Sequence, residues 1–281
     1  MMRIGSLGAT IVLLACIFAV SWWGARWLNR GAAWLVVLVL LTLFAGVVGQ
    51  AVSKHPFGLL IDERNKMSLA RFQTALWTVV VLAAFVVAAL WNVRTDTPGR
   101  QPAADAARPA GPLEIAVPQE LWLALGISAT ALIGSALIKG AKANQRPPGT
   151  PGVSLAAVAT DALGTVRITT PEGQVNVQGK LHVKRGEGAT NQPDWTDMFK
   201  GDEAGNYAYL DLSKLQMFFF TLILVLTYAV AITKAFGRQY FAFPDIDEGF
   251  VTLLAISQGT YLATKAAPHT PDPPNPPTGG K

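Results

Sequence analysis

Residues 72–93 have the sequence FQTALWTVVVLAAFVVAALWNV, and these 22 residues contain no charged side chain. About 20 such apolar residues are enough for a helix to cross the hydrocarbon core of a bilayer. Only 15% of the chain is charged, against about a quarter in soluble domains. The sequence therefore predicts an all-α membrane protein with six transmembrane helices and excludes a soluble globular enzyme. The five other uncharged stretches are Ile4–Ala25, Gly31–Ser53, Leu121–Ile138, Leu215–Thr233 and Gly249–Thr264.

Lysine and arginine are divided unevenly between the two sides of the expected membrane. Those near the span ends number 12 on the side of the N-terminus and 7 on the opposite side. Cytoplasmic loops carry the excess of positive charge, so we expect both termini in the cytoplasm. The same rule accounts for the net charge of +5, so we do not expect nucleic-acid binding. Six of the eight tryptophans are expected at the outer interface. They are Trp22, Trp23, Trp27, Trp34, Trp91 and Trp122.

The loops divide the chain into five segments. We expect a transmembrane hairpin at 1–53 (spans 1–2), a second hairpin at 54–142 (spans 3–4) with an irregular outer loop at 94–120, a cytoplasmic β-rich insert at 143–210, a third hairpin at 211–267 (spans 5–6), and a disordered proline-rich tail at 268–281.

The insert contains three short β-branched stretches that alternate in polarity. They are Thr165–Thr169, Gln174–Val177 and Leu181–Lys184, with glycines between them. Alternation over four to eight residues, bounded by turn residues, is typical of strands. The insert is therefore expected to hold a small β-meander. So few residues bury little core of their own, so we expect it to pack against the membrane helices or a partner.

One sequence pattern occurs twice. Residues 68–78 (SLARFQTALWT) align with residues 211–221 (DLSKLQMFFFT), and Leu, Gln and Thr are identical. Each copy opens an uncharged stretch from the same side, so spans 3–4 and 5–6 are expected to be two parallel helical-hairpin repeats.

The repeated residues have expected roles. Gln73 and Gln216, with Thr78 and Thr221, are expected to form the repeat interface, because an unpaired amide in hydrocarbon is costly. The alternative is a pair of gates or ligand contacts. Arg71 and Lys214 lie in the first turns and are expected to contact lipid headgroups.

The stretches FKGDEAGN (199–206), DLSKLQMFFFT (211–221) and ISQGTYLATK (256–265) carry a resemblance. They resemble a family of bacterial polytopic inner-membrane proteins. The resemblance lies mostly in the C-terminal half of the chain. It implies a bacterial inner (cytoplasmic) membrane as the location and brings no activity and no site residue.

Catalytic and transport motifs are missing from the sequence. The six uncharged stretches hold no acid or cation, which energy-coupled transporters usually need within the membrane. Phosphate-binding loops, zinc-binding helices and nucleophile elbows do not occur either, so we expect neither an enzyme nor a cofactor. Four acidic residues are candidates for a cation site, with capping and ion pairing as the alternative. They are Asp194, Asp197, Asp202 and Glu203.

Five mild polar residues lie in spans 4 and 6, and they could line a pore or pack helices together. They are Ser128, Thr130, Ser257, Gln258 and Thr260. We expect a non-catalytic membrane scaffold that docks a protein partner through segment 150–210 and forms a homo- or hetero-oligomer in the lipid bilayer. An oligomeric channel lined by these five residues is the alternative, and a passive small-molecule carrier is a third.

Overall fold

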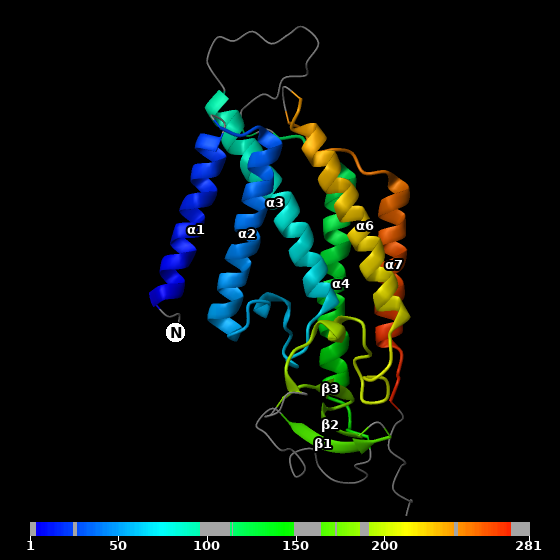
Figure 1. Ribbon diagram of the computed structural model, residues 1–281. Coiled ribbons are helices and arrows are strands. Elements are labelled where there is room, and N and C mark those ends of the chain that lie inside the picture. Colours follow the sequence, from blue (N-terminus) through cyan, green and yellow to red (C-terminus); the bar gives the residue numbers. More distant parts are fainter. Residues whose placement is uncertain are drawn as a thin grey trace, which may run out of the picture. The chain divides into compact units, whose positions relative to one another are not determined.

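The computed structural model describes residues 4–24, 27–95, 113, 115–148, 164–171, 173–185, 191–238 and 241–270. Each of the six uncharged stretches forms a helix (Figure 1), which confirms the mainly helical fold. The helices are α1 (Ile4–Trp23), α2 (Arg30–Ser53), α3 (Leu69–Thr95), α4 (Gln119–Ala143), α6 (Leu212–Ala235) and α7 (Glu248–Ala266). Most of the expected outer loop and tail, and parts of the insert, lie outside the described residues.

Four helices are long and apolar enough to cross a membrane: α2, residues 69–94 of α3, α4 and α6. Their mean hydropathy is 2.0 to 2.5, so the chain is a membrane protein. The apolar part of α1 is shorter (Leu7–Trp23), and α7 is not among the four. Many large apolar side chains are exposed on the spans, as a lipid-facing surface requires. Examples are Leu35, Val39 and Leu43 on α2 and Ile223, Leu226 and Val230 on α6.

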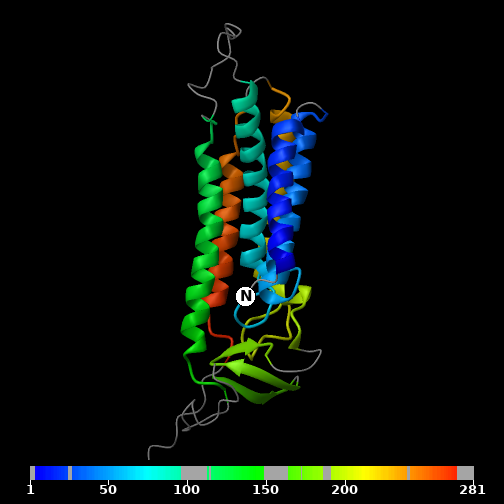
Figure 2. The same ribbon diagram turned by 90° about the vertical axis from the view of Figure 1, so that its left-hand side faces the viewer.

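The insert contains a three-stranded antiparallel sheet in the order β1-β2-β3 (Figure 2). Its strands are β1 (Thr165–Thr170), β2 (Gly173–Gln178) and β3 (Leu181–Val183). Val166 pairs with Val177 and Ile168 with Val175. Side chains of alternate residues share a face, and Val166, Val175 and Val177 pack with Ala204 in one buried cluster. The predicted β-meander is confirmed.

The turn between β2 and β3 packs against the C-terminal end of α4 (Figure 1). Lys180 N donates to the carbonyl oxygen of Lys142 at 3.1 Å. Gly179 has φ +58°, and a Cβ at this position would lie 2.3 Å from the same oxygen. Only glycine combines this backbone conformation with so close an approach.

The chain divides into two compact units. Unit 1 consists of Met1–Leu59, Gln73–Gly126 and Phe220–Leu254. Unit 2 consists of Leu60–Phe72, Ile127–Phe219 and Ala255–Lys281. Helices α3, α4, α6 and α7 therefore contribute residues to both units.

Unit 1 is a packed helical bundle. Trp34 of α2 is 1% exposed and donates its indole N–H to the carbonyl oxygen of Val80 at 3.3 Å. The ring of Trp77 in α3 lies 5.9 Å from that of Tyr228 in α6. Trp34 is thus a packing residue, whereas Trp27 is 87% exposed as an interfacial tryptophan should be.

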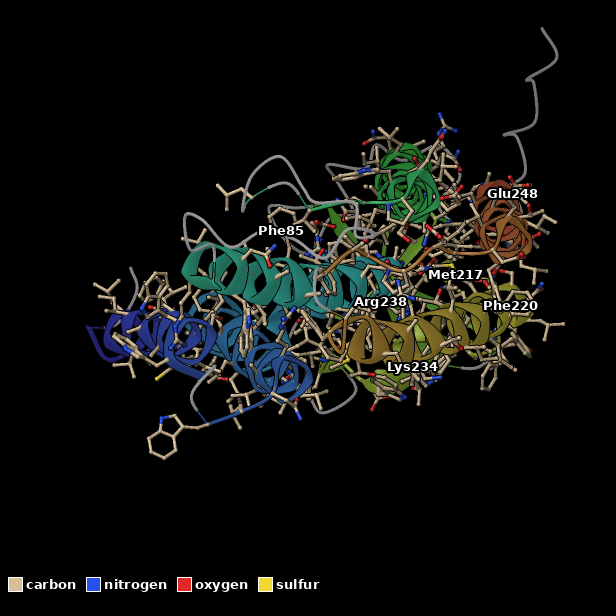
Figure 3. The ribbon with its side chains drawn as sticks, turned by 90° about the horizontal axis from the view of Figure 1, so that it is seen from above. Phe85, Met217, Phe220, Lys234, Arg238 and Glu248 are labelled. Atoms are coloured by element: carbon tan, nitrogen blue, oxygen red, sulfur yellow. The ribbon has the colours of Figure 1, made fainter. Side chains whose placement is uncertain are left out.

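Charged side chains of unit 1 are found at helix ends. Figure 3 looks along the helices from the end where α6 finishes and α7 begins, and it labels Lys234, Arg238 and Glu248 there. Lys234 lies in the last turn of α6 and Glu248 in the first turn of α7, which suits the helix dipoles. Phe85 of α3, also labelled, stacks on Phe243 with ring centroids 6.5 Å apart.

Unit 2 holds an aromatic cluster beside the starts of α3 and α6. Phe218 of α6 lies edge-to-face against Phe199 at 5.1 Å and against Trp195 at 6.3 Å. Phe72 of α3 contacts the same Trp195 edge-on at 5.8 Å. Edge-to-face pairs at these distances are favourable beyond the area they bury. They join the insert to the two helices.

Candidate functional site

Asp202 of the insert forms ion pairs with cations of three different elements. Its Oδ1 lies 2.8 Å from Arg64 Nη2. Its Oδ2 lies 3.2 Å from Lys214 Nζ and is also bonded by Lys265 Nζ. Arg64 comes from the loop before α3, Lys214 from the first turn of α6 and Lys265 from the last turn of α7. Because Asp202 is 8% exposed, these charges attract each other with little solvent screening.

Further buried charges surround this carboxylate. Together they form the Asp202 network: Asp62, Arg64, Lys66, Lys139, Lys142, Asp202, Glu203, Lys214 and Lys265. All nine belong to unit 2.

Asp62 shapes the loop that presents Arg64. Its Oδ1 accepts from the backbone N–H of Arg64 at 3.0 Å and of Lys66 at 3.3 Å. Asn65 has φ 59°, a conformation that asparagine tolerates in turns. Asp62 Oδ2 accepts from Arg64 Nη2 at 2.9 Å and from Lys139 Nζ of α4 at 3.0 Å. Arg64 therefore lies between two carboxylates.

Glu203 extends the network to the end of α7. Lys142 of α4 donates to Glu203 Oε1 and to the carbonyl oxygen of Ala267 at 2.7 Å. Glu203 Oε2 accepts from the backbone N–H of His269 at 3.1 Å. A lysine near a helix C-terminus satisfies carbonyls that have no partner within the helix. One side chain of α4 thus caps α7 and pairs with the insert.

The carboxylates of the network are ionised. Burial opposes ionisation of Asp62 and Asp202, but their cationic neighbours outweigh it and hold the pKa of both carboxyls well below the ordinary value. For Asp202 these neighbours are Arg64, Lys214 and Lys265, and for Asp62 they are Arg64 and Lys139.

Cations outnumber carboxylates in the network, six to three. Lys66 is 1% exposed and forms no ion pair with any carboxylate in the described part of the chain. Its Nζ lies 3.2 Å from the carbonyl oxygen of Gly201 and 3.4 Å from His182 Nδ1. Burial, together with the nearby Arg64 charge, lowers the pKa of Lys66 to about 7.

His182 is neutral beside Lys66. Burial and the charges of Lys66 and Arg64 lower the pKa of its imidazole to about 3. Its ring also lies 4.6 Å from that of Tyr207. The Nδ1 atom of a neutral imidazole can accept the Lys66 proton in a hydrogen bond.

The four acidic candidates for a cation site are all engaged. Asp194 caps the 3₁₀ helix η4 (Trp195–Met198) in a capping box with Asp197, and Asp197 pairs with Lys184 at 2.8 Å. Asp202 and Glu203 belong to the network. Among the residues that the structure describes, no group of three His, Cys, Asp or Glu side chains could hold a metal ion. Capping and ion pairing account for these carboxylates.

The residues expected at the repeat interface are placed differently. Gln73 and Thr221, both 1% exposed, are hydrogen-bonded to each other, with Gln73 Nε2 as the donor. Gln216, the counterpart of Gln73, is exposed on α6. Thr78 is also exposed and donates to the carbonyl oxygen of Thr74 in its own helix. The structure therefore brings two of the four together.

Arg71 and Lys214, which were expected to contact lipid headgroups, contact protein groups in the structure. Arg71 is partly buried, donates to the carbonyl oxygen of Ile61 at 2.9 Å and pairs with the exposed Glu63. Lys214 is 4% exposed, forms an ion pair with Asp202 and donates a hydrogen bond to the carbonyl oxygen of Lys200 at 2.6 Å. Lys214 thus places its charge inside unit 2.

The five candidate pore residues separate into two groups. Ser128, Ser257 and Gln258 are buried at 1 to 3% exposure, whereas Thr130 and Thr260 are exposed.

Six members of the network were not among the candidate site residues: Asp62, Arg64, Lys66, Lys139, Lys142 and Lys265. Of these, Asp62 was expected only as an acidic residue before span 3, and Arg64 and Lys66 only as its ion-pairing partners. A signal was present at the end of α4. Ser128, Ser135, Lys139 and Lys142 recur at intervals of three, four or seven residues, which places them on one helix face. Such a polar face on an apolar helix indicates a contact inside the protein, although it does not identify the carboxylate that pairs with these lysines.

No family model, curated protein or solved structure matches the chain significantly. The geometry therefore carries the functional argument. Asp202 and Glu203 connect the insert by ion pairs to α4, α6, α7 and the loop before α3 within unit 2.

We predict that Asp202→Asn strongly destabilises the protein. The amide leaves three buried cations without their carboxylate, and loss of one partner of a buried pair costs about 3 kcal/mol or more. Thermal unfolding in detergent, followed by tryptophan fluorescence, measures the change. Glu63→Gln is the control, because Glu63 is exposed and its pair with Arg71 should contribute about 0–1 kcal/mol. Equal effects of the two substitutions would contradict the role given to Asp202.

We also predict that Lys66 makes stability depend on pH. Between its folded pKa of about 7 and its ordinary pKa of about 10.4, the unfolded chain binds one proton more than the folded chain, so wild-type stability rises with pH. Lys66→Met removes this slope and stabilises the protein near pH 6 by about 2 kcal/mol. Unfolding midpoints of both proteins from pH 6 to pH 9.5 test this. A difference between them that does not shrink as pH rises would rule it out.

Proposed function

We propose that this chain is a non-catalytic membrane scaffold that docks a protein partner through residues 150–210. The observation that carries the proposal is the burial of Asp202 and Glu203 of the insert against side chains at the helix ends. Such pairs are costly to break singly, so the insert is held in one position instead of moving on a linker. A rigid surface reduces the ordering cost of binding a partner.

The insert offers an open sheet edge as the docking surface. Strand β1 is at the edge of the sheet, and among the described residues no strand pairs with its outer side. An extended segment of a partner can add to such an edge through backbone hydrogen bonds. The side chains of Arg167 and Thr169 on β1 are exposed beside it.

The proposal includes six spans in a bacterial inner membrane, with both termini in the cytoplasm and spans 3–4 and 5–6 as parallel repeats. Two apolar helices, α1 and α7, accompany the four long ones, and the excess of lysine and arginine on one side supports the orientation. The Gln73–Thr221 hydrogen bond between α3 and α6 supports contact between the first helices of the repeats.

An oligomeric channel has less support. Its lining would have to face neighbouring protomers, yet Ser128, Ser257 and Gln258 are buried within the chain and only Thr130 and Thr260 of the five are exposed. Two hydroxyls offer a weak polar wall for a conducting path. This placement favours the scaffold over the channel and over a passive carrier.

The orientation is tested by cysteine labelling in a Cys16→Ser background. A cysteine at Gly279 should react with an impermeant thiol reagent only from the cytoplasmic side, and one at Ala104 only from outside, since an even number of spans separates the two termini. Intact cells and inverted vesicles provide the two sides. Labelling of Gly279 from outside would show that the span count or the orientation is wrong.

The docking role is tested by photo-crosslinking in cells. A photoreactive phenylalanine at Arg167 should give one protein adduct of constant mass, because the side chain is exposed beside the open edge. The same residue at Trp27, which is 87% exposed in unit 1, is the control and should give no such adduct. Replacing residues 164–185 by a Gly/Ser linker should leave membrane insertion intact, because the spans are untouched. An adduct at both positions, or at neither, would refute docking through the insert.

A further inference from the structure

Polar side chains follow one another along the contact between α4 and α7 inside unit 2. The helices are in contact here, since a Cβ on Gly134 of α4 would lie 3.1 Å from the side chain of Leu262 of α7. Spacings of three, four and seven residues place the polar residues on the facing sides. They are Ser128, Ser135 and Lys139 on α4 and Ser257, Gln258, Tyr261 and Lys265 on α7, all buried.

Hydrogen bonds connect one end of this polar row to the Asp202 network. Lys265 Nζ donates to Asp202 and to the hydroxyl oxygen of Tyr261 at 3.0 Å. The Tyr261 hydroxyl in turn shares a hydrogen bond with Ser135 Oγ at 3.0 Å. Asp202, Lys265, Tyr261 and Ser135 are therefore joined by consecutive hydrogen bonds, which connect the insert to the helix pair.

The other end of the row holds polar atoms without partners. Ser257 is 1% exposed and Gln258 is 3% exposed. Within the described residues, the Ser257 hydroxyl and both amide atoms of Gln258 have no hydrogen-bond partner. An unpaired buried amide or hydroxyl costs several kcal/mol in an environment that cannot hydrogen-bond.

Ser257 departs from the behaviour of other helical hydroxyls in this chain. Ser21 and Thr42 donate to the carbonyl oxygen four residues earlier, at 2.8 Å and 2.9 Å. Such a bond satisfies a hydroxyl within its own helix. The Ser257 hydroxyl makes none, so it is available to a ligand together with the Gln258 amide one residue later.

We propose that Ser257 and Gln258 form an internal binding site for water at the end of this row that is farther from Asp202. Gln258 supplies a donor and an acceptor, and the Ser257 hydroxyl can act as either. Buried water typically makes two to four hydrogen bonds to otherwise unsatisfied polar groups, and it is the smallest molecule that both donates and accepts. The ammonium groups of Lys139 and Lys265 lie in the same row, which disfavours a cation. With water bound at this site, the row of hydrogen-bonding groups that begins at Asp202 continues as far as Gln258.

Radiolytic hydroxyl-radical footprinting of the intact protein tests the site, because the radicals form from water and modify side chains beside it. Tyr261 and Tyr228 are a matched pair, at 2% and 3% exposure. Tyr228 donates to the carbonyl oxygen of Pro244 at 3.1 Å, whereas Tyr261 lies one helical turn from Ser257. Tyr261 should be modified several-fold faster than Tyr228 if water is bound beside it. Equal rates in the wild type would overturn the proposal.

A double substitution locates the water. Ser257→Ala with Gln258→Leu removes the three free polar atoms and should lower the Tyr261 rate to that of Tyr228. An unchanged Tyr261 rate in this variant would place the water elsewhere and would also overturn the proposal. The buried Tyr228, whose rate should stay low, reports on folding, and Gln258→Met serves if the double variant does not fold. None of these outcomes depends on a docking partner.

Discussion

A single buried carboxylate has to compensate cations that arrive from three separate parts of the chain. Asp202 is bonded to Arg64, Lys214 and Lys265, and no part of unit 2 can move away without leaving a charge unpaired in a poorly hydrated interior. This requirement holds the loop before α3, the insert and the ends of α6 and α7 together. The small sheet could not persist on its own core, and it gains its support in this way.

The excess of positive charge in the Asp202 network lowers the pKa of one of its lysines. With six cations and three carboxylates, the cation without an acidic partner, Lys66, is the one whose pKa falls near neutrality. Arg64 keeps its charge between Asp62 and Asp202, and its pKa is raised. The pKa values of two neighbouring side chains in one loop are thus shifted in opposite directions, because Arg64 has carboxylates within reach and Lys66 has a carbonyl oxygen and a neutral imidazole.

The elements that the sequence predicted are those encoded by local periodicity. The uncharged stretches are helices and the three alternating stretches are strands, because both patterns act over a few neighbouring residues. The network could not be predicted in this way, since a lysine at the end of an apolar stretch has the same local sequence whether it reaches lipid or a buried acid. Its acid, Asp202, is 138 residues from Arg64. The aligned Gln73 and Gln216 show the same limit: similar surroundings in the sequence do not determine which helix face is covered, and one is buried while the other is exposed.

The order in which the ribosome makes the chain adds a consequence to the position of Lys265. Arg64, Lys139 and Lys142 are synthesised before Asp202, but Lys265 follows it by 63 residues. The nascent insert therefore leaves the ribosome before its last counter-charge exists, and Asp202 first meets only the cations of earlier segments and of α6. Only α7 completes the set and brings the carbonyl oxygens that Lys142 caps. Unit 2 therefore cannot form all of these ion pairs before α7 has been synthesised.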